Sequence, residues 1–394
     1  MDAVDTSKPK VSLLYNPKAR GIAYQAVLCA VIGVLVYGAI SNAIDNLTRA
    51  KIASGFGFWT TTAGFDINQT LIEYTNTSTY GRAFWVGLLN TLLVSALGIV
   101  FATILGFGIG IARLSNNWLL ARLAAGYVQV IRNIPLLLQL LFWYNAVLKA
   151  LPEQLQDSFI IPGGGFLNRR GLFLPEPIFG NGAGVALAAL VAGIVAAAIF
   201  RAWARRRQME TGAHAPVLVV ALALVVLPPL IALMLAGFPI EFVYPQPNRF
   251  NIQGGIEILP EFMALLFGLV IYTAAFIAEV VRAGLLAVSR GQTEAAYSLG
   301  LPTRPTLRLV VIPQAMRVII PPLTSQYLNL TKNSSLAVAI GYPDLVQIFT
   351  GTVLNQTGQA VEVVTLTMAV YLTISLGTSL LMNLYNRRVA LVER

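Results

Sequence analysis

Residues 294–313, EAAYSLGLPTRPTLRLVVIP, form a short polar segment between two long apolar runs at 260–284 and 318–341. A helix of about 20 apolar residues is long enough to cross the roughly 30 Å hydrocarbon core of a bilayer. Both neighbours of the polar segment meet this length. The quoted stretch is therefore expected to be a water-exposed connection between two transmembrane helices.

Further apolar runs along the chain pass the same length test. Together they predict eight membrane spans, near residues 22–45, 84–112, 123–148, 183–203, 216–237, 260–284, 318–341 and 362–386. The composition agrees, because 56% hydrophobic and 11% charged residues is too apolar for a water-soluble domain of 394 residues. The first run is longer than a signal-peptide core and lacks a small-x-small cleavage site, so it is expected to stay as a helix. The predicted fold class is an all-α integral membrane protein.

The distribution of Lys and Arg predicts the orientation of these spans. With the N-terminus in the cytoplasm, eighteen basic residues fall in inner segments and seven in outer ones. Positive residues accumulate on the cytoplasmic side of short loops, so both termini are predicted to be cytoplasmic. The net charge of +10 follows largely from this asymmetry, and no nucleic-acid partner is expected.

Several kinds of site are excluded by the residues that the chain lacks. Cys29 is the single cysteine and His214 the single histidine, and no Gly-x4-Gly-Lys-Ser/Thr occurs. No catalytic residue, metal site or bound cofactor is therefore predicted, and energy must come from another chain. Gly106 and Gly110 lie four apart in an apolar run, which suits close helix packing in lipid and not a dinucleotide loop.

The polar segment itself predicts a helical hairpin. Thr293–Leu299 is rich in helix-forming residues, Gly300 permits a turn, and Pro302 cannot continue the helix. A second helix is expected to begin near Thr303–Pro305 and return to the membrane. The small side chains of the first helix would permit close approach of another protein surface.

The spacing of this hairpin also resembles a known motif. Glu-Ala-Ala, a Gly four residues after the second Ala, and an apolar-x-Ile-Pro ten residues further on are similar to the cytoplasmic loop of ABC importer membrane subunits. Val310 stands where Ile is commoner. The resemblance implies that contact with an ATPase is made by Glu294, Ala295, Ala296, Gly300, Ile312 and Pro313.

Over most of its length the chain resembles the larger permease subunits of polar and general L-amino-acid ABC importers of Gram-negative bacteria. This implies the type I importer permease fold, with a five-helix core, an extra N-terminal helix and an inserted helix pair. It also implies a multi-pass protein of the bacterial inner membrane that works with a second permease subunit in a heterodimer. A dimer of ATP-binding subunits, carrying ATP and Mg, and a periplasmic amino-acid-binding protein complete the implied partners, together with membrane lipid.

The expected domain organisation follows from the spans and the resemblance. It comprises a cytoplasmic N-terminus (1–21), the extra first helix with a periplasmic segment (22–83), the transmembrane domain (84–386) with the helix pair near 183–237, and a cytoplasmic tail (387–394). Phe56, Phe58 and Trp59 are expected to anchor in the headgroup region, or else to help form a platform for a binding protein. Residues 150–182 are expected to form an irregular outer loop.

The cargo path is predicted along the seventh span, where residues 324–335 hold nine polar residues in twelve. Such a run lines either an aqueous path or an interface between helices, and Lys332 could bind a cargo carboxylate. The candidate path residues are Gln139, Glu279, Gln326, Asn329, Lys332, Asn333 and Ser334. Counting residues along each helix separates Glu279 and Lys332 by about 12 Å in depth, so Arg282 is the favoured partner of Glu279.

The segment Arg132–Leu140, RNIPLLLQL, is similar to one in polar amino-acid permeases. Pro135 is expected to loosen the third span near its inner end. Arg132 either gates the inner mouth or anchors the span there. Gln139 would face the apolar interior and would need a partner, either cargo or another helix.

Two other functions compete with the importer. An ion-coupled secondary amino-acid transporter would need paired repeats and buried coupling groups, and no convincing internal repeat is present. A membrane-embedded enzyme would need a clustered acid–base or metal set, which the sequence lacks.

Overall fold

The structure is a computed structural model that describes residues 17–49, 54–153, 157–180, 183–213, 215–237, 240–248 and 252–389. The predictions made for the first sixteen residues, for His214 and for the last five residues of the tail lie outside the described residues. They stay predictions.

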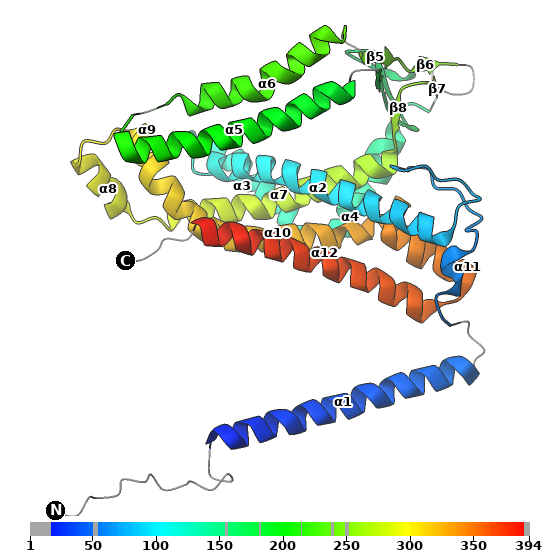
Figure 1. Cartoon of the computed structure of the whole chain (residues 1–394). Helices are drawn as coiled ribbons and strands as arrows, with labels where there is room; N and C mark the ends of the chain where they lie inside the picture. The colour runs from blue at the N-terminus through cyan, green and yellow to red at the C-terminus, as the bar shows by residue number, and fades with distance from the viewer. Residues whose placement is uncertain are drawn as a thin grey trace, which may run out of the picture. The chain divides into compact units, whose positions relative to one another are not determined.

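Helices of very different lengths make up most of the described chain (Figure 1). They are α1 (Pro17–Arg49), α2 (Tyr80–Ala112), α3 (Trp118–Asn133), α4 (Leu136–Leu141), α5 (Ala183–Thr211), α6 (Val217–Leu235), α7 (Pro260–Leu286), α8 (Arg290–Ser298), α9 (Thr303–Thr306), α10 (Ile312–Asn333), α11 (Leu354–Thr357) and α12 (Ala360–Val389). Within the described ranges, seven helical stretches are long and apolar enough to cross a membrane, and the bent pair that begins with α3 makes eight. Each of the eight predicted spans overlaps one of them.

Tighter and wider helical turns extend several of these helices. The 3₁₀ turns are Gly57–Thr60, Leu148–Ala150 and Ser334–Ala339. The π-helical turns are Phe142–Val147, Leu307–Val311 and Gln347–Val353.

The third predicted span is broken at Pro135. α3 ends at Asn133, α4 begins at Leu136, and the two halves of the span meet at 104°. Proline disfavours the helical conformation in the residue before it, and Ile134 is extended, with φ −102° and ψ 127°. Pro135 was predicted to loosen the helix, but it ends it and creates an elbow.

Eight short strands occupy the segments before α5 and after α6. They are β1 (Phe159–Ile161), β2 (Gly165–Asn168), β3 (Gly171–Leu174), β4 (Glu176–Phe179), β5 (Ile240–Val243), β6 (Gln246–Pro247), β7 (Ile252–Gln253) and β8 (Ile256–Ile258). All pairings are antiparallel, in a four-stranded sheet of order β1-β2-β3-β8 and in the pairs β4-β5 and β6-β7. The prediction of an irregular loop at 150–182 was therefore wrong.

The described residues fall into two compact units, one formed by those within 1–90 together with 343–376 and the other by those within 91–342 together with 377–389. The core of the first unit is aromatic. Phe58 is buried, and the Trp59 ring lies 5.1 Å from that of Phe84. Two of the three aromatics expected at the headgroup region thus pack inward, and only Phe56 is well exposed.

A buried carboxylate also belongs to the first unit, outside the membrane-spanning helices. Asp344 accepts hydrogen bonds from the backbone N–H of Gln347 at 2.8 Å and from the hydroxyl of Tyr371 at 3.1 Å. Burial raises the pKa of Asp344 to about 7, although these hydrogen bonds favour the ionised form. The protonated acid is therefore favoured over much of the acidic range.

In the second unit, α7 packs against α2 and α10 through small residues. A Cβ atom placed on Gly106 would lie 2.6 Å from Cβ of Ile277, and one on Gly110 would lie 2.8 Å from the carbonyl oxygen of Ala278. The predicted packing role of these two glycines is confirmed. Gly284 of α7 lies equally close to the side chain of Ile319 on α10.

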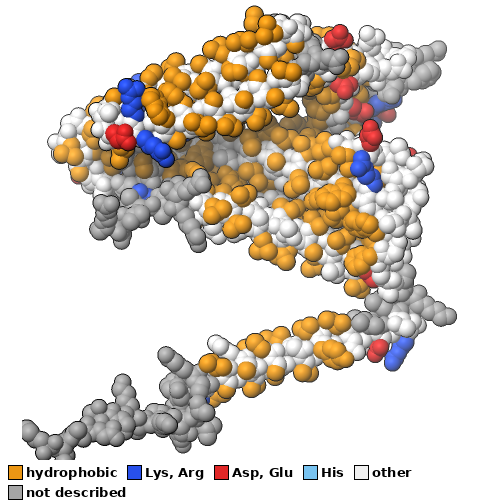
Figure 2. Space-filling view, in the orientation of Figure 1, with side chains coloured by type: hydrophobic (Ala, Val, Ile, Leu, Met, Phe, Trp, Pro, Cys, Tyr) orange, Lys and Arg blue, Asp and Glu red, His pale blue; other side chains and the backbone are white. Residues whose placement is uncertain are grey.

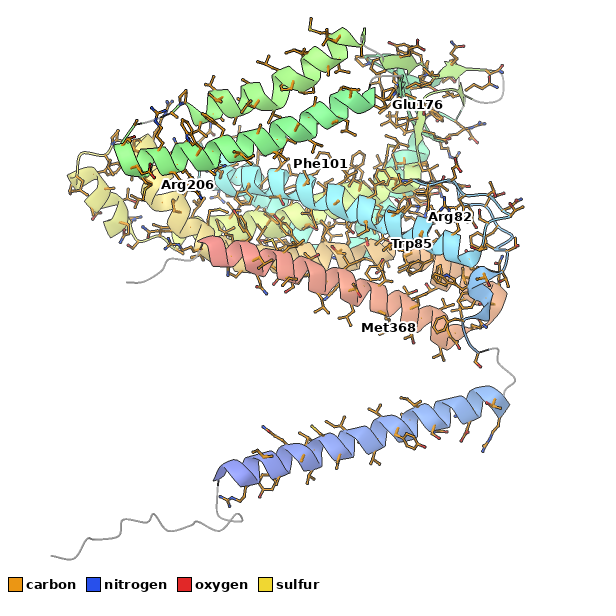
Figure 3. All side chains as sticks on the ribbon, in the orientation of Figure 1. Arg82, Trp85, Phe101, Glu176, Arg206 and Met368 are labelled. Atoms are coloured by element: carbon orange, nitrogen blue, oxygen red, sulfur yellow. The ribbon has the colours of Figure 1, made fainter. Side chains whose placement is uncertain are left out.

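Helices α5 and α6, the predicted inserted pair, pack mainly on each other. Gly193 lies directly against the carbonyl oxygen of Leu224, so the backbones approach closely. Hydrophobic side chains cover the outer surface of this pair in Figure 2. Figure 3 marks its two ends, with Glu176 in β4 before α5 and Arg206 in the last turns of α5.

Candidate functional site

The polar segment between α7 and α10 folds as the predicted helical hairpin. α8 ends in a turn in which Gly300 has φ +77°. The N–H of Gly300 donates to the Tyr297 carbonyl at 2.9 Å, and that of Leu301 donates to the Ala296 carbonyl at 3.1 Å. This pair of bonds is a Schellman motif, which needs a left-handed residue at its centre, so glycine is favoured there.

One side of the hairpin is closed and the other is open. Ala296 and Thr306 are buried, and the Thr306 hydroxyl donates to the Leu301 carbonyl at 3.3 Å. Glu294 and Ala295 are exposed, as are Tyr297 and Leu299 of the same turn. A surface containing charged, small and apolar groups is thereby available to another protein.

The hairpin is connected to α10 at both of its ends. The amide of Gln314 in α10 donates to the side-chain oxygen of Gln292 in α8 at 3.1 Å. Ile312 and Pro313 form the first turn of α10 and follow a π-helical turn without a break in the helical path. Displacement of α8 would therefore be passed to α10.

The polar residues of α10 divide between an exposed and a buried side. Asn329 and Lys332 lie three apart on the exposed side, while Gln326 and Asn333 are half-buried. Ser334 is buried and donates to the Thr331 carbonyl at 2.8 Å. Among the described residues, Lys332 forms no ion pair, so its ammonium group is free to meet a ligand or a partner.

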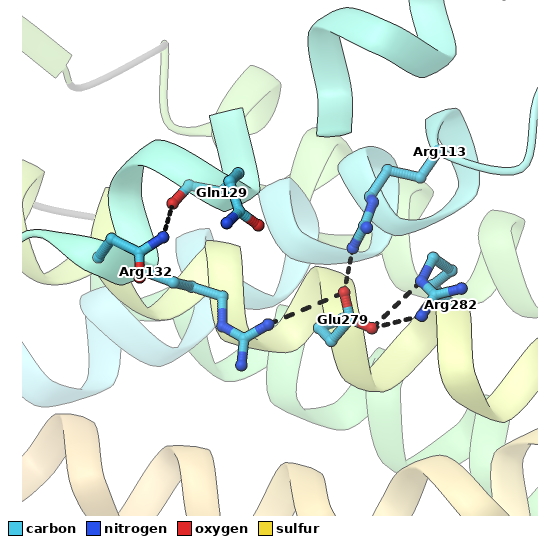
Figure 4. Close-up of polar contacts among 6 residues, drawn as sticks. Arg113, Gln129, Arg132, Glu279 and Arg282 are labelled. Carbon is cyan, nitrogen blue, oxygen red and sulfur yellow. Dashed lines mark hydrogen bonds and ion pairs between the residues drawn. The ribbon is translucent and has the colours of Figure 1, made fainter. Parts of the chain in front are cut away.

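Glu279 lies at the centre of a cluster of arginines (Figure 4). Arg282 donates to its Oε1 at 2.6 Å, as predicted, and Arg113 donates to its Oε2. Arg132 is more distant, with 3.9 Å between its Nη1 and Oε2 of Glu279, and its guanidinium lies 5.0 Å from the centre of the Phe276 ring. Among the described residues no other acid pairs with these arginines, so the cluster carries two positive charges in excess.

The participation of Arg113 was not predicted from the sequence. Arg113 directly follows α2 and lies three residues after Gly110, so it continues the helix face that carries Gly106 and Gly110. That face packs on α7. That periodicity was available in the sequence and would have directed Arg113 toward the helix that carries Glu279.

Gln139 finds its partner in the backbone of its own segment. Its Nε2 donates to the carbonyls of Ile131 and Ile134, each at 2.9 Å. These carbonyls lie at the end of α3, where the break at Pro135 removes their helical partners. Gln139 thus stabilises the elbow, and it is buried beneath the apolar side chains around it.

Metal binding finds no support in the described ranges. No group of three or more His, Cys, Asp and Glu side chains there could hold a metal ion.

Residues 189–391 match the family described as "Binding-protein-dependent transport system inner membrane component". The chain is 51% identical to the General L-amino acid transport system permease protein AapQ of Rhizobium johnstonii, over 97% of this chain and 95% of that protein. It is 52% identical to the putative amino-acid ABC transporter permease protein YhdX of Escherichia coli, over 96% of each chain.

More distant similarity is also present. The Glutamate/glutamine/aspartate/asparagine transport system permease protein BztB of Rhodobacter capsulatus is 44% identical over 97% of this chain and 96% of its own. A solved amino-acid ABC transporter crystallised with histidines is 23% identical, with a TM-score of 0.46 over 78% of this chain and 95% of that one.

The apolar helices and the relatives together show that this is a multi-pass integral membrane protein with a transport role. The chain belongs to the family of binding-protein-dependent transport system inner membrane components, the permeases of ABC importers. The predicted resemblance and the predicted helical permease fold are confirmed, and nothing found favours the ion-coupled alternative.

Proposed function

We propose that this chain is a permease subunit that forms part of the path for L-amino acids in an ATP-driven importer of the bacterial inner membrane. The relatives named above are permeases of amino-acid transport systems, and the matches extend over nearly the whole chain. The observation that carries the proposal is the hairpin at 290–313, a rigid and exposed lever connected to α10.

ATP and Mg are bound by a separate ATPase dimer in this proposal. The ATPase contacts the exposed side of α8 through Glu294 and Ala295, and its closure moves the hairpin as one body because Gly300 fixes the turn. Movement reaches the membrane through Ile312 and Pro313. ATP binding then shifts α10 between two positions by differential contact with the hairpin.

The orientation places the hairpin and both termini in the cytoplasm, in agreement with the count of basic residues. In this proposal the cytoplasmic N-terminus ends at residue 21, and the extra first helix with its periplasmic segment ends at residue 83. The transporter domain ends at residue 386 and includes the inserted helix pair. A periplasmic binding protein delivers cargo to the opposite side, where the short strands lie in this orientation.

A second permease subunit completes the path by facing the polar side of α10. Lipid would not tolerate Asn329 and Lys332 there, and an aqueous path between two subunits would. Lys332 is well suited to hold the cargo carboxylate, with Gln326 and Asn333 nearby on the same helix.

The elbow at Pro135 serves as an inner gate in this proposal. Arg132 makes the longest of the contacts to Glu279, so it is the one that opens at least cost when α3 moves. Arg113 and Arg282 hold the carboxylate in place in either position.

The test replaces Gly300, whose left-handed conformation a β-branched residue adopts poorly. Gly300→Val in the assembled transporter, reconstituted in proteoliposomes, is expected to lower ATP-driven amino-acid uptake at least tenfold while ATP hydrolysis continues. Gly300→Asn is the matched control, because Asn tolerates this conformation, and it should keep most of the uptake. Full uptake by the Val variant would contradict the lever, and uptake that ignores ATP depletion but collapses with a protonophore would contradict the importer.

A further inference from the structure

The elbow between α3 and α4 encloses an apolar groove of about 310 Å³. Its walls are the side chains of Ile131, Ile134, Leu138, Phe142, Trp143 and Ile271. Gln139 also lines the groove, but it is buried and its Nε2 already donates to two backbone carbonyls at the elbow, so only its Oε1 is left without a hydrogen-bond partner among the described residues. A groove with such walls favours a hydrocarbon chain over a charged solute.

The arginine cluster lies beside this groove, on the side of the hairpin. Along α7, Ile271 in the groove is about 22 Å from Leu286, where the helix leads into the hairpin, and Glu279 in the cluster is only about 10 Å from it. Arg132 follows the groove residue Ile131 directly in sequence, and its side chain is 40% exposed. The charged cluster therefore lies nearer the hairpin, and the apolar groove lies farther from it, along the axis of α7.

We propose that Arg132 and the elbow groove together bind one anionic phospholipid, with its phosphate on the Arg132 guanidinium and one acyl chain in the groove. The cluster lies nearer the hairpin than the groove does, and this order fits a lipid in the leaflet next to the hairpin. Such a lipid has its headgroup toward the hairpin and its acyl chains toward the bilayer centre. The assignment of that leaflet as the cytoplasmic one rests on the proposed function. The two excess positive charges of the cluster select an anionic lipid over a zwitterionic one.

Arg132 is the arginine of the cluster that can accept such a ligand. Both oxygens of Glu279 already receive hydrogen bonds, Oε1 from Arg282 and Oε2 from Arg113. The 3.9 Å distance from Arg132 exceeds a hydrogen bond, so its planar N–H groups can form a bidentate contact with a phosphate. A bound lipid would thus hold α3 away from Glu279 and bias the position of the elbow.

The experiment measures the lipid retained by the complete transporter. The complex is assembled in nanodiscs with equal amounts of phosphatidylglycerol and phosphatidylcholine of identical acyl chains, and bound lipid is counted by native mass spectrometry. The wild-type complex should retain phosphatidylglycerol at least fivefold over phosphatidylcholine. Arg132→Gln should abolish this preference, whereas Arg122→Gln, an exposed arginine on the same helix, should keep it.

A second variant tests the groove without changing charge. Leu138→Trp fills the groove at an exposed wall and should lower phosphatidylglycerol retention severalfold, with gel filtration confirming an intact complex. Glycerophosphoglycerol, the headgroup without acyl chains, should fail to displace the lipid at millimolar concentration. Unchanged retention in Arg132→Gln, equal loss in Arg122→Gln, or displacement by the headgroup alone would each overturn the proposal. Lipid counting needs no transport, so its failure is separable from failure of the Gly300 test.

Discussion

α7 and α6 are both apolar enough to cross a membrane, yet they meet different surroundings. Their most apolar windows have mean hydropathies of 2.2 and 2.9, but 61% of the α7 window is buried and none of the α6 window is. The more hydrophobic helix is the exposed one (Figure 2). Hydropathy measures the cost of leaving lipid for water, and it does not distinguish a lipid neighbour from a protein neighbour.

The difference lies in where small residues occur. α7 presents Gly268, Ala274, Ala278 and Gly284 to its neighbours, and all four are buried. α6 consists mainly of Leu, Val, Ile and Ala, includes Pro228 and Pro229, and has no buried residue. Close packing in lipid depends on small residues that let backbones approach, so their placement marks the core helix.

The largest expected effect comes from removing a buried side chain of α7. Leu269→Ala leaves a cavity at a fully buried position and should destabilise the protein by about 2–5 kcal/mol. Leu227→Ala in α6 removes the same atoms at a half-exposed position and should change stability by less than about 0.5 kcal/mol. Thermal unfolding followed by fluorescence-detected gel filtration compares them, and equal shifts would remove the distinction between the two helices.

Adding volume at a glycine should have the next largest effect. Gly284→Leu would push against Ile319 and should cost about 1–3 kcal/mol. Gly184→Leu near the start of α5 has no atom within 4 Å of the added Cβ and serves as the control. A loss of folded protein in both variants would show that α5 at Gly184 packs as closely against a neighbour as α7 does at Gly284.

A smaller, local effect is expected for Gly193→Leu, which separates α5 from α6 at the Leu224 carbonyl. Trypsin should then cleave after Arg205–Arg207 several times faster, since the end of α5 loses its neighbour. The midpoint of thermal unfolding should move less than in Gly284→Leu, because α7 is untouched. A shift as large as that of Gly284→Leu would mean that the pair α5 and α6 stabilises the core around α7.

The last prediction concerns Asp344, a buried acid of the first unit that a hydropathy profile does not single out. The raised pKa of Asp344 means that the folded state holds its proton more tightly than the unfolded state. Its contribution to stability is fully present below about pH 4 and is lost as pH rises through about 7. The unfolding temperature should therefore fall between pH 5 and pH 8, and Asp344→Asn should reduce that fall. An unchanged pH dependence would show that Asp344 does not titrate as its burial implies.

Features that depend on local sequence were predictable from the chain alone. The eight apolar runs predicted the eight membrane spans. The helix-forming residues of α8, followed by Gly300 and Pro302, predicted the hairpin. The packing of Gly106 followed from spacing within one helix. Periodicity and turn chemistry act over a few residues, so a single sequence displays them.

Features that depend on distant partners were not predictable in this way. Leu172 in β3 pairs with Ile258 in β8, although α5 and α6 lie between them in the sequence. Neither segment alternates between apolar and polar residues strongly enough to predict a strand. The pairing of Arg113 with Glu279 likewise joins residues 166 positions apart. Only the fold brings such residues together, and many other pairings are compatible with the same composition.

The β4–β5 ladder brings together the two ends of the segment that carries α5 and α6. Phe179 and Ile240 face each other as antiparallel partners, so this segment leaves and re-enters the rest of the fold at one point. A segment whose ends coincide can be gained or lost in a single genetic event without stretching the chain on either side. A shortened gene that joins Phe179 to Ile240 through a two-residue turn should still encode a protein that inserts into the membrane.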